Sequence, residues 1–198
     1  MTKRFFDFFI ASILIIVLMP LFLMIYFLIL RSLGKPVIFT QIRPGLCGKP
    51  FKLYKFRSMT NQKDQRGNFL PDSERLSVFG RLLRASSCDE WPALWNVIKG
   101  EMSLVGPRPL LMEYLPLYNK RQARRHNVKP GITGWAQVNG RNALSWPERF
   151  EMDVWYVDNH SFFLDLKILF MTVKKVLFRE GIAESGQVTM SKFTGNTK

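Results

Sequence analysis

A long apolar segment near the N-terminus constrains this chain more than any other feature of its sequence. No charged residue lies between Phe8 and Leu30, and most of the segment is Ile, Leu and Phe. As a straight helix it would reach about 34 Å, enough to cross the hydrocarbon core of a bilayer. A cleaved signal peptide is not expected, because its apolar core is shorter and ends at a small-residue cleavage site. The sequence therefore predicts a membrane-embedded unit over residues 1–35.

Pro20 lies near the middle of this segment and opens two ways of placing it in the membrane. A proline removes one backbone donor and clashes with the preceding turn, so it kinks or breaks a helix. Each half is then about 17–22 Å long, too short to cross alone. Lys3 and Arg4 favour the cytoplasmic side, and so does the basic remainder of the chain. We therefore expect a re-entrant, Pro-broken helix that dips into the bilayer and returns, and a spanning helix is the alternative.

The remainder, residues 36–198, has the composition of a soluble domain with a strong excess of positive charge. The chain contains 29 Lys and Arg against 15 Asp and Glu, and of these only Lys3, Arg4 and Asp7 precede Arg31. Such a domain should seek nucleic acid, an anionic membrane face or phosphate-rich substrates. No reading helix or aromatic RNA platform is recognisable, so nucleic acid is not expected as a partner.

Periodicity and turn residues predict an α+β domain that is mostly helical and contains a small β-hairpin. The hairpin strands are expected at Val37–Ile42 and Phe51–Met59, and loops at Thr60–Glu74 and Lys129–Asn142. Helical patterns cover three further stretches: one beginning at Leu76, one from Ser87 to Lys99 and one from Leu110 to Arg125.

The last two expected helices begin at clear start signals. Ser145 and Glu148 have the spacing of a capping box, and their helix should run to about Asp158. Ser161 begins a helix to about Glu180, followed by a polar, loosely held tail from residue 182. Its apolar face is of the kind that usually packs in a core, but neighbouring lysines also suit an interfacial amphipathic helix. The face comprises Phe162, Phe163, Leu166, Leu169, Phe170, Val173 and Leu177.

Two adjacent carboxylates, Asp89 and Glu90, stand at an expected helix start. Ser87 and Glu90 fit a capping box, and the helix dipole stabilises acids in a first turn, so capping alone can explain the pair. A functional alternative arises because guanidinium groups bind phosphate oxygens bidentately, and paired carboxylates beside phosphates suit Mg²⁺. The candidate phosphate-binding cations are Lys55, Arg57, Arg84, Arg108 and Arg141.

Several long motifs follow one another along the chain. They are Val37–Gln41 with Arg43-Pro44-Gly45, Lys52–Met59, Asp89-Glu90 with Leu94–Val97, Lys99–Ser103, Gly106–Pro109, Lys129–Gly134 and Gln137–Asn142. With these motifs the sequence resembles the monotopic phosphoglycosyl transferases, the bacterial sugar transferase family, over essentially its whole length. It looks most like the minimal single-domain members that initiate glycan assembly on polyprenol phosphate, such as the N-linked glycosylation type. Cys88, before the acid pair, departs from the commonest pattern.

The resemblance implies a two-step reaction and a role for each site residue. Asp89 would attack the sugar-bearing phosphorus of a UDP-sugar, release UMP and form a covalent aspartyl-phosphosugar, which polyprenol (undecaprenyl) phosphate then takes up. Glu90, with Asp89, would help to hold Mg²⁺. The residues implied to neutralise phosphate oxygens are Lys55, Arg84, Arg108 and Arg141.

The resemblance also implies where the protein works. The donor is cytosolic and the acceptor is a lipid, so the cytoplasmic face of the bacterial inner membrane is expected. Membrane lipids and downstream glycosyltransferases are the further partners. An N-acetylated or diacetamido 6-deoxy sugar is expected from subgroup likeness alone, and Asp158 and Asp165 are expected to be structural. The rivals are a lipid phosphatase, in which water accepts the group, and a non-enzymatic membrane scaffold.

Overall fold

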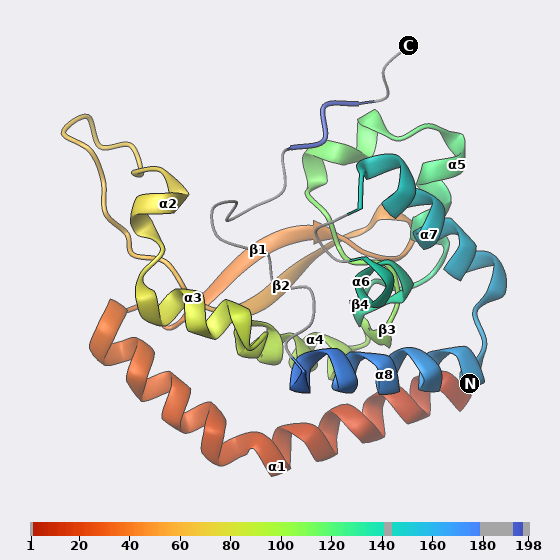
Figure 1. Ribbon diagram of the computed structural model, residues 1–198, viewed down its shortest axis with the longest axis horizontal. Coiled ribbons are helices and arrows are strands. Elements are labelled where there is room, and N and C mark those ends of the chain that lie inside the picture. Colours follow the sequence, from red (N-terminus) through yellow and green to blue (C-terminus); the bar gives the residue numbers. More distant parts are fainter. Residues whose placement is uncertain (1, 141–143, 179–191, 196–198) are drawn as a thin grey trace.

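The computed structural model describes residues 2–140, 144–178 and 192–195 and confirms the expected fold class, α+β and mostly helical with a small hairpin. Figure 1 shows a body of short elements resting on two long helices, α1 and α8. The elements are α1 (Thr2–Leu33), β1 (Ile38–Pro44), η1 (Leu46–Gly48), β2 (Pro50–Phe56), α2 (Asp72–Arg75), α3 (Val78–Ala85), η2 (Cys88–Ala93), α4 (Leu94–Lys99), β3 (Ser103–Val105), η3 (Met112–Leu117), α5 (Lys120–Ala123), η4 (Arg124–Asn127), β4 (Gly131–Thr133), α6 (Trp135–Asn139), α7 (Trp146–Asn159) and α8 (Phe162–Leu177).

Helix α1 lies along one edge of the molecule and is bent into a broad V (Figure 1). Pro20 lies inside it, which is the usual cause of such a bend. Asp7 and Ala11 are buried before the proline and Ile25 and Ile29 after it, so each arm buries one stripe at the i, i+4 spacing of a helix. Most other apolar side chains of α1 are exposed, and by length and composition the helix could cross a membrane.

The first turns of α1 are joined to the body by buried polar contacts. The Arg4 guanidinium donates hydrogen bonds to the carbonyl oxygens of Val97 and Ile98 at the end of α4. The Asp7 carboxylate accepts from Ser103 Oγ at 2.8 Å and from the Leu104 amide at 3.3 Å. The N-terminal arm is therefore fixed to α4 and β3.

The other end of α1 is joined to the same body. The buried Arg57 side chain, just after β2, donates to the carbonyl oxygens of Leu33, Gly34 and Lys35. Leu33 is the last residue of α1, so its carbonyl has no intrahelical partner, and Gly34 and Lys35 follow directly after the helix. The sequence suggested that Arg57 binds phosphate. In the structure it instead caps the end of α1.

Two small sheets form the β-structure. Strands β1 and β2 make the expected antiparallel hairpin, with Phe39 opposite Lys55 and Arg43 opposite Phe51. Strands β3 and β4 form a parallel pair that was not predicted, within a stretch expected to be partly loop. Glycine permits this close approach, because a Cβ on Gly131 would lie 2.1 Å from the Gly106 amide nitrogen.

Three expectations about single stretches of the chain are wrong. The stretch Leu110–Arg125 is not one helix, because Pro116 falls in it and the chain forms η3, then α5, then η4. The stretch Ser87–Lys99 is divided into η2 and α4, with Pro92 inside η2. The tail is not loose where it is described, because Phe193 is buried among Tyr114, Trp146 and Phe150.

The last two helices begin as expected. Ser145 and Glu148 form a complete capping box at the start of α7, and the Ser161 hydroxyl caps α8. The expected end of α8 at Glu180 lies outside the described residues. The apolar face of α8 is largely uncovered, so its usual interpretation as core is wrong for most of its members. The exposed members are Phe162, Phe163, Leu166, Phe170 and Val173.

Candidate active site

Asp89 and Glu90 lie in the short 3-10 helix η2, which packs on strand β2. Ser87, before it, has a left-handed backbone with φ of 58° and makes no side-chain capping bond. The expected Ser87–Glu90 capping box is therefore absent, because Glu90 turns to cations from two other segments. Capping does not explain this pair of carboxylates.

Glu90 joins the two cations of the site. Lys55 Nζ lies 2.6 Å from Glu90 Oε1, and the Arg108 guanidinium donates to Oε1 at 2.5 Å and to Oε2 at 3.2 Å. Burial alone would raise the pKa of Glu90, but Arg108 and Lys55 outweigh it and hold the pKa far below its usual range. Glu90 is therefore a permanent anion that fixes both cations in place.

Asp89 is in the opposite situation. Its side chain is buried, and no described residue forms a hydrogen bond or ion pair with its carboxylate. Burial, helped by the negative charge of Glu90, raises the pKa of Asp89 to about 6, although Lys55, Arg108 and Arg84 act against the rise. At neutral pH this carboxylate is mostly ionised and poorly solvated, which suits a nucleophile.

The remaining expected cations divide into two groups. Arg84 belongs to the site, because its charge acts on Asp89 and its Nε is fixed by donating to Ser58 Oγ at 2.9 Å. Arg141 lies outside the described residues. The structure thus brings together Lys55, Arg84, Arg108 and the two carboxylates from four separate segments of the chain.

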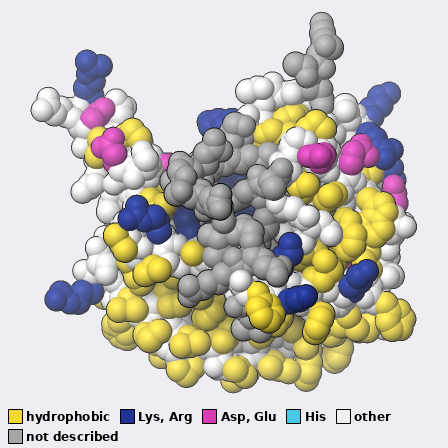
Figure 2. Space-filling view, in the orientation of Figure 1, with side chains coloured by type: hydrophobic (Ala, Val, Ile, Leu, Met, Phe, Trp, Pro, Cys, Tyr) yellow, Lys and Arg dark blue, Asp and Glu magenta, His cyan; other side chains and the backbone are white. Residues whose placement is uncertain are grey.

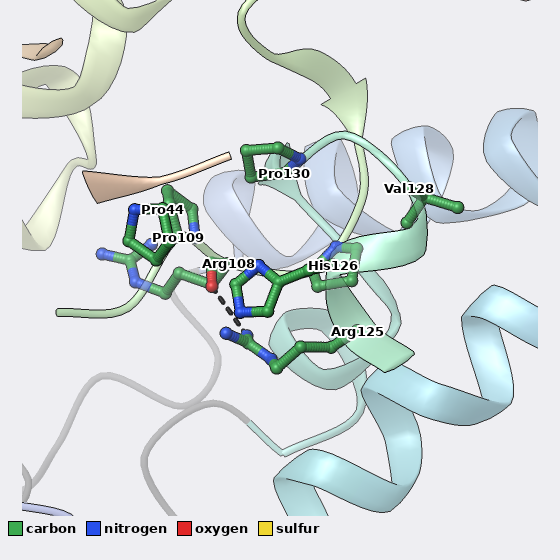
Figure 3. Close-up of a pocket in the computed structure, with 8 residues that line it drawn as sticks. Pro44, Arg108, Pro109, Arg125, His126, Val128 and Pro130 are labelled. Atoms are coloured by element: carbon green, nitrogen blue, oxygen red, sulfur yellow. Dashed lines mark hydrogen bonds between the residues drawn. The ribbon is translucent and has the colours of Figure 1, made fainter. Parts of the chain in front are cut away.

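A buried arginine that the sequence did not single out supports the Arg108 loop. The Arg125 guanidinium donates to the carbonyl oxygen of Arg108 at 2.7 Å and to Asp153 Oδ2 at 2.7 and 3.0 Å. Figure 3 shows this contact in a narrow crevice, where the Arg108 side chain runs beside Pro44. The sequence shows only a cluster of basic residues here, and nothing in it separates Arg125 from its exposed neighbours.

Arg43, at the end of β1, is a second cation that the sequence did not single out. Burial and then the charge of Arg108 lower the pKa of Arg43 to about 10. Its place in the Arg43-Pro44-Gly45 motif was the available signal.

The donor set limits how a metal ion could bind. The described residues contain no group of three or more His, Cys, Asp or Glu side chains that could hold one. Both oxygens of Glu90 are engaged by cations, so Asp89 is the available carboxylate of the pair. Mg²⁺ commonly takes one or two protein carboxylates and completes its shell with phosphates and water, and the site fits such an ion only together with a phosphate substrate.

Comparison with known proteins identifies the family of this chain. The model for bacterial sugar transferases matches residues 1–179. The chain belongs to the bacterial sugar transferase family.

Three relatives show the range of this family. The chain is 60% identical to the uncharacterized sugar transferase EpsL of Bacillus subtilis, over 98% of this chain and 96% of that protein. It is 39% identical to the UDP-glucose:undecaprenyl-phosphate glucose-1-phosphate transferase of Klebsiella pneumoniae, over 87% of this chain. It is 38% identical to the undecaprenyl-phosphate galactose phosphotransferase of Salmonella typhimurium, over 90%. The last two bacterial sugar transferases are longer, and the match spans 39% and 41% of their lengths.

Proposed function

We propose that this protein is a phosphoglycosyl transferase that moves a sugar phosphate from a UDP-sugar to polyprenol phosphate. The observation behind this proposal is the Asp89 carboxylate, which is buried, has no partner among the described residues and lies within the field of Lys55, Arg84 and Arg108. The relatives named as moving glucose 1-phosphate or galactose phosphate with undecaprenyl phosphate support the same reaction class.

In the first step Asp89 attacks the sugar-bearing phosphorus of the UDP-sugar. A bond forms between an Asp89 oxygen and this phosphorus, and the bond to the bridging oxygen breaks, so that UMP leaves with the electron pair. Lys55, Arg84 and Arg108 neutralise the charge that moves onto the departing phosphate. Because Glu90 already holds Lys55 and Arg108, little reorganisation is needed at the moment of reaction.

In the second step an oxygen of the polyprenol phosphate attacks the same phosphorus, and the bond to Asp89 breaks. The intermediate is a mixed carboxylic-phosphoric anhydride, which keeps the transfer potential of the original diphosphate. A covalent relay also allows a polar donor and a lipid acceptor to use one site in turn. The product, a polyprenyl-diphosphate sugar, would then pass to downstream glycosyltransferases.

Mg²⁺ is part of the proposal as a substrate-associated ion. Asp89 is the side chain that would bind it, together with phosphate oxygens of the donor, since Glu90 is occupied by Lys55 and Arg108. When bound, the ion would withdraw charge from the diphosphate.

We propose that α1 is a re-entrant helix on the cytoplasmic face of the inner membrane, and its contacts with the body support re-entry over spanning. Both ends of α1 are bonded to one body, at Arg4 and Asp7 on one side of the bend and at Arg57 on the other. A spanning helix would have to separate these ends by the thickness of the bilayer. Figure 2 shows an almost unbroken hydrophobic surface along the α1 edge of the molecule, with hydrophobic and basic side chains next to each other above it, in the region of α8.

Cysteine labelling in sealed vesicles tests this topology. Cys47 and Cys88 are first replaced by Ser, and single cysteines are then introduced by Thr2→Cys or Lys35→Cys. A re-entrant helix places both positions on the cytoplasmic side, so an impermeant maleimide should label both only from that side. Labelling of the two positions from opposite sides would establish a spanning helix.

The reaction is tested with the full chain in detergent or nanodiscs. It is incubated with Mg²⁺, undecaprenyl phosphate and UDP-glucose, UDP-galactose or N-acetylated UDP-sugars, and UMP is measured. Without acceptor, intact mass should increase by one sugar phosphate. Asp89→Asn should lose both signals, whereas the control Asp158→Asn, an exposed partner of Arg124, should keep them. Folded protein that releases no UMP from any donor would refute the proposal, and release of free sugar phosphate would favour the phosphatase.

A further inference from the structure

Arg43 lies on the same face of the hairpin as Lys55. In the antiparallel register Phe39 is opposite Lys55, and side chains two and four residues along a strand share a face, so Phe39, Gln41 and Arg43 face the same way as Lys55. Gln41 Oε1 accepts a hydrogen bond from the Arg43 guanidinium at 2.7 Å, which fixes the direction of that side chain. This face of the hairpin thus carries a second cation besides Lys55, nearer to the turn.

The Arg43 guanidinium lacks a counter-ion among the residues that the structure describes. None of their carboxylates forms an ion pair with it, and its Nε is buried without a hydrogen-bond acceptor. Arg108 lies close enough to repel it, and Figure 3 shows the Arg108 side chain beside Pro44, the next residue along the chain. A half-buried cation next to a like charge is unfavourable unless an anion joins the two, and two guanidinium groups suit one phosphate.

Arg108 is among the charges that act on Asp89, whereas Arg43 is not. The side chains that act most strongly on Asp89 are Glu90, Lys55, Arg108 and Arg84, whereas those that act on Arg43 include Arg108 and Glu90. Arg108 is therefore shared between the two neighbourhoods. A phosphate next to Asp89 would contact Arg108, and a phosphate one step farther out would lie between Arg108 and Arg43.

We infer that Arg43 and Arg108 form a binding site for a phosphate monoester, distinct from the position of the phosphorus under attack. This inference rests on the proposed two-step reaction and extends it. In an in-line displacement the group that leaves lies opposite Asp89, and so does the group that later displaces Asp89. UMP leaves from that side and the lipid phosphate attacks from it. Both are phosphate monoesters, so one site serves both.

Arg43→Gln removes the charge and the paired guanidinium donors but keeps a polar, unbranched side chain. In titrations of the full chain, the dissociation constant of UMP should rise roughly tenfold or more, the range expected for loss of a hydrogen bond between charged groups. Binding of uridine, which has no phosphate, should not change. The KM values for the UDP-sugar and for undecaprenyl phosphate should both rise. Arg43→Lys should show smaller effects, because it keeps the charge and loses the planar fork.

Arg66→Gln is the matched control, because Arg66 is an exposed arginine in the segment between β2 and α2. It should leave all four quantities unchanged, and thermal unfolding should confirm that each variant is folded. UMP affinity of Arg43→Gln equal to wild type would overturn the inference while leaving the proposed function intact. A rise in KM for the donor alone would overturn the shared site. If wild type turns over no donor, the proposed function fails, and the preference for UMP over uridine still tests Arg43.

Discussion

The protonation state of Asp89 should set the pH range of the proposed reaction. With a pKa of about 6, Asp89 is ionised above that pH and protonated below it. A protonated carboxyl is a poor nucleophile, so acceptor-free release of UMP should be level above pH 7 and fall about tenfold per pH unit below 6. Single-turnover rates between pH 4.5 and 8 at a saturating donor concentration would measure this acidic limb of the pH–rate profile.

Glu90 should set the position of that limb. Its negative charge raises the pKa of Asp89, so Glu90→Gln should move the limb to lower pH. The maximal rate should also fall, because Lys55 and Arg108 lose the carboxylate that holds them. The pH profile separates the two effects. A lower maximal rate with an unmoved limb would show that Asp89 is not the group that titrates.

The same carboxyl should destabilise the folded protein at neutral pH. Its pKa is higher in the folded chain than the ordinary 3.8, so the folded state holds the proton more tightly. Stability from this group is fully present below about pH 4 and is lost as pH rises through 6, by at most about 3 kcal/mol. Asp89→Asn should therefore unfold at a higher temperature than wild type at pH 7.5 and show little difference near pH 4. A variant less stable than wild type at pH 7.5 would contradict this assignment.

At the scale of elements, the sequence predicted the features that depend on residues only a few positions apart. The capping residues of α7 and α8 and the turn of the hairpin all act within a few positions, and these elements form as expected. Ser87 carries an equally good local signal, yet its capping box is absent because Lys55 and Arg108 compete for Glu90. The sequence contains Glu90, Lys55 and Arg108, but it does not show that the fold brings them together.

The elements that were missed depend on contacts between distant segments. Each strand of the β3–β4 pair is three residues long, too short to show a period, and each is defined by a partner more than twenty positions away. Arg43 joins the site only because the hairpin lies against the loop that contains Arg108. The sequence was enough to predict that arginines and carboxylates form the site. Only the fold shows that Arg43 belongs to it and that Arg57 does not.

The hydrogen bonds of Asp7 should contribute strongly to holding α1 against the body. Asp7→Ala would leave the Ser103 hydroxyl and the Leu104 amide buried without an acceptor, which typically costs about 1–3 kcal/mol. We expect a lower unfolding temperature in detergent and faster proteolysis near the N-terminus. Ser12→Ala is the control, because that hydroxyl is exposed and bonds only to its own helix, at the Phe8 carbonyl. Equal stability of the two variants would show that the Asp7 contacts do not hold α1 to the body, and that the Arg4 and Arg57 contacts and apolar packing are sufficient.

At the scale of the whole molecule, the candidate site and the apolar surface are directly connected. Phe22 of α1 packs against Trp91, the residue after Glu90, with ring centroids 5.7 Å apart. Near the N-terminal end of α1, Phe6 packs edge-on against Phe162 of α8 at 5.1 Å. The two helices therefore form one surface, and a bilayer that covers it would fix the height of Asp89 relative to the lipid headgroups. In the proposed reaction the phosphate of the polyprenol carrier would lie among these headgroups.

This arrangement predicts that α8 serves the lipid acceptor and not the nucleotide donor. Phe163 and Phe170 are 81% and 73% exposed, and replacing both by Ser removes apolar area that we expect to lie in the bilayer. Burial of a phenylalanine contributes about 1.5–3 kcal/mol, so the KM for undecaprenyl phosphate in nanodiscs should rise roughly tenfold or more. Acceptor-free release of UMP should stay near the wild-type rate, because the polar site is unchanged.

A matched substitution away from this surface completes the test. Phe69 is 56% exposed in the segment between β2 and α2, so Phe69→Ser should change neither half-reaction. Loss of UMP release in the Phe163 and Phe170 double variant would mean that α8 supports the fold and does not position the site. An unchanged KM for the lipid would mean that α1 alone determines depth, because its exposed apolar residues outnumber those of α8.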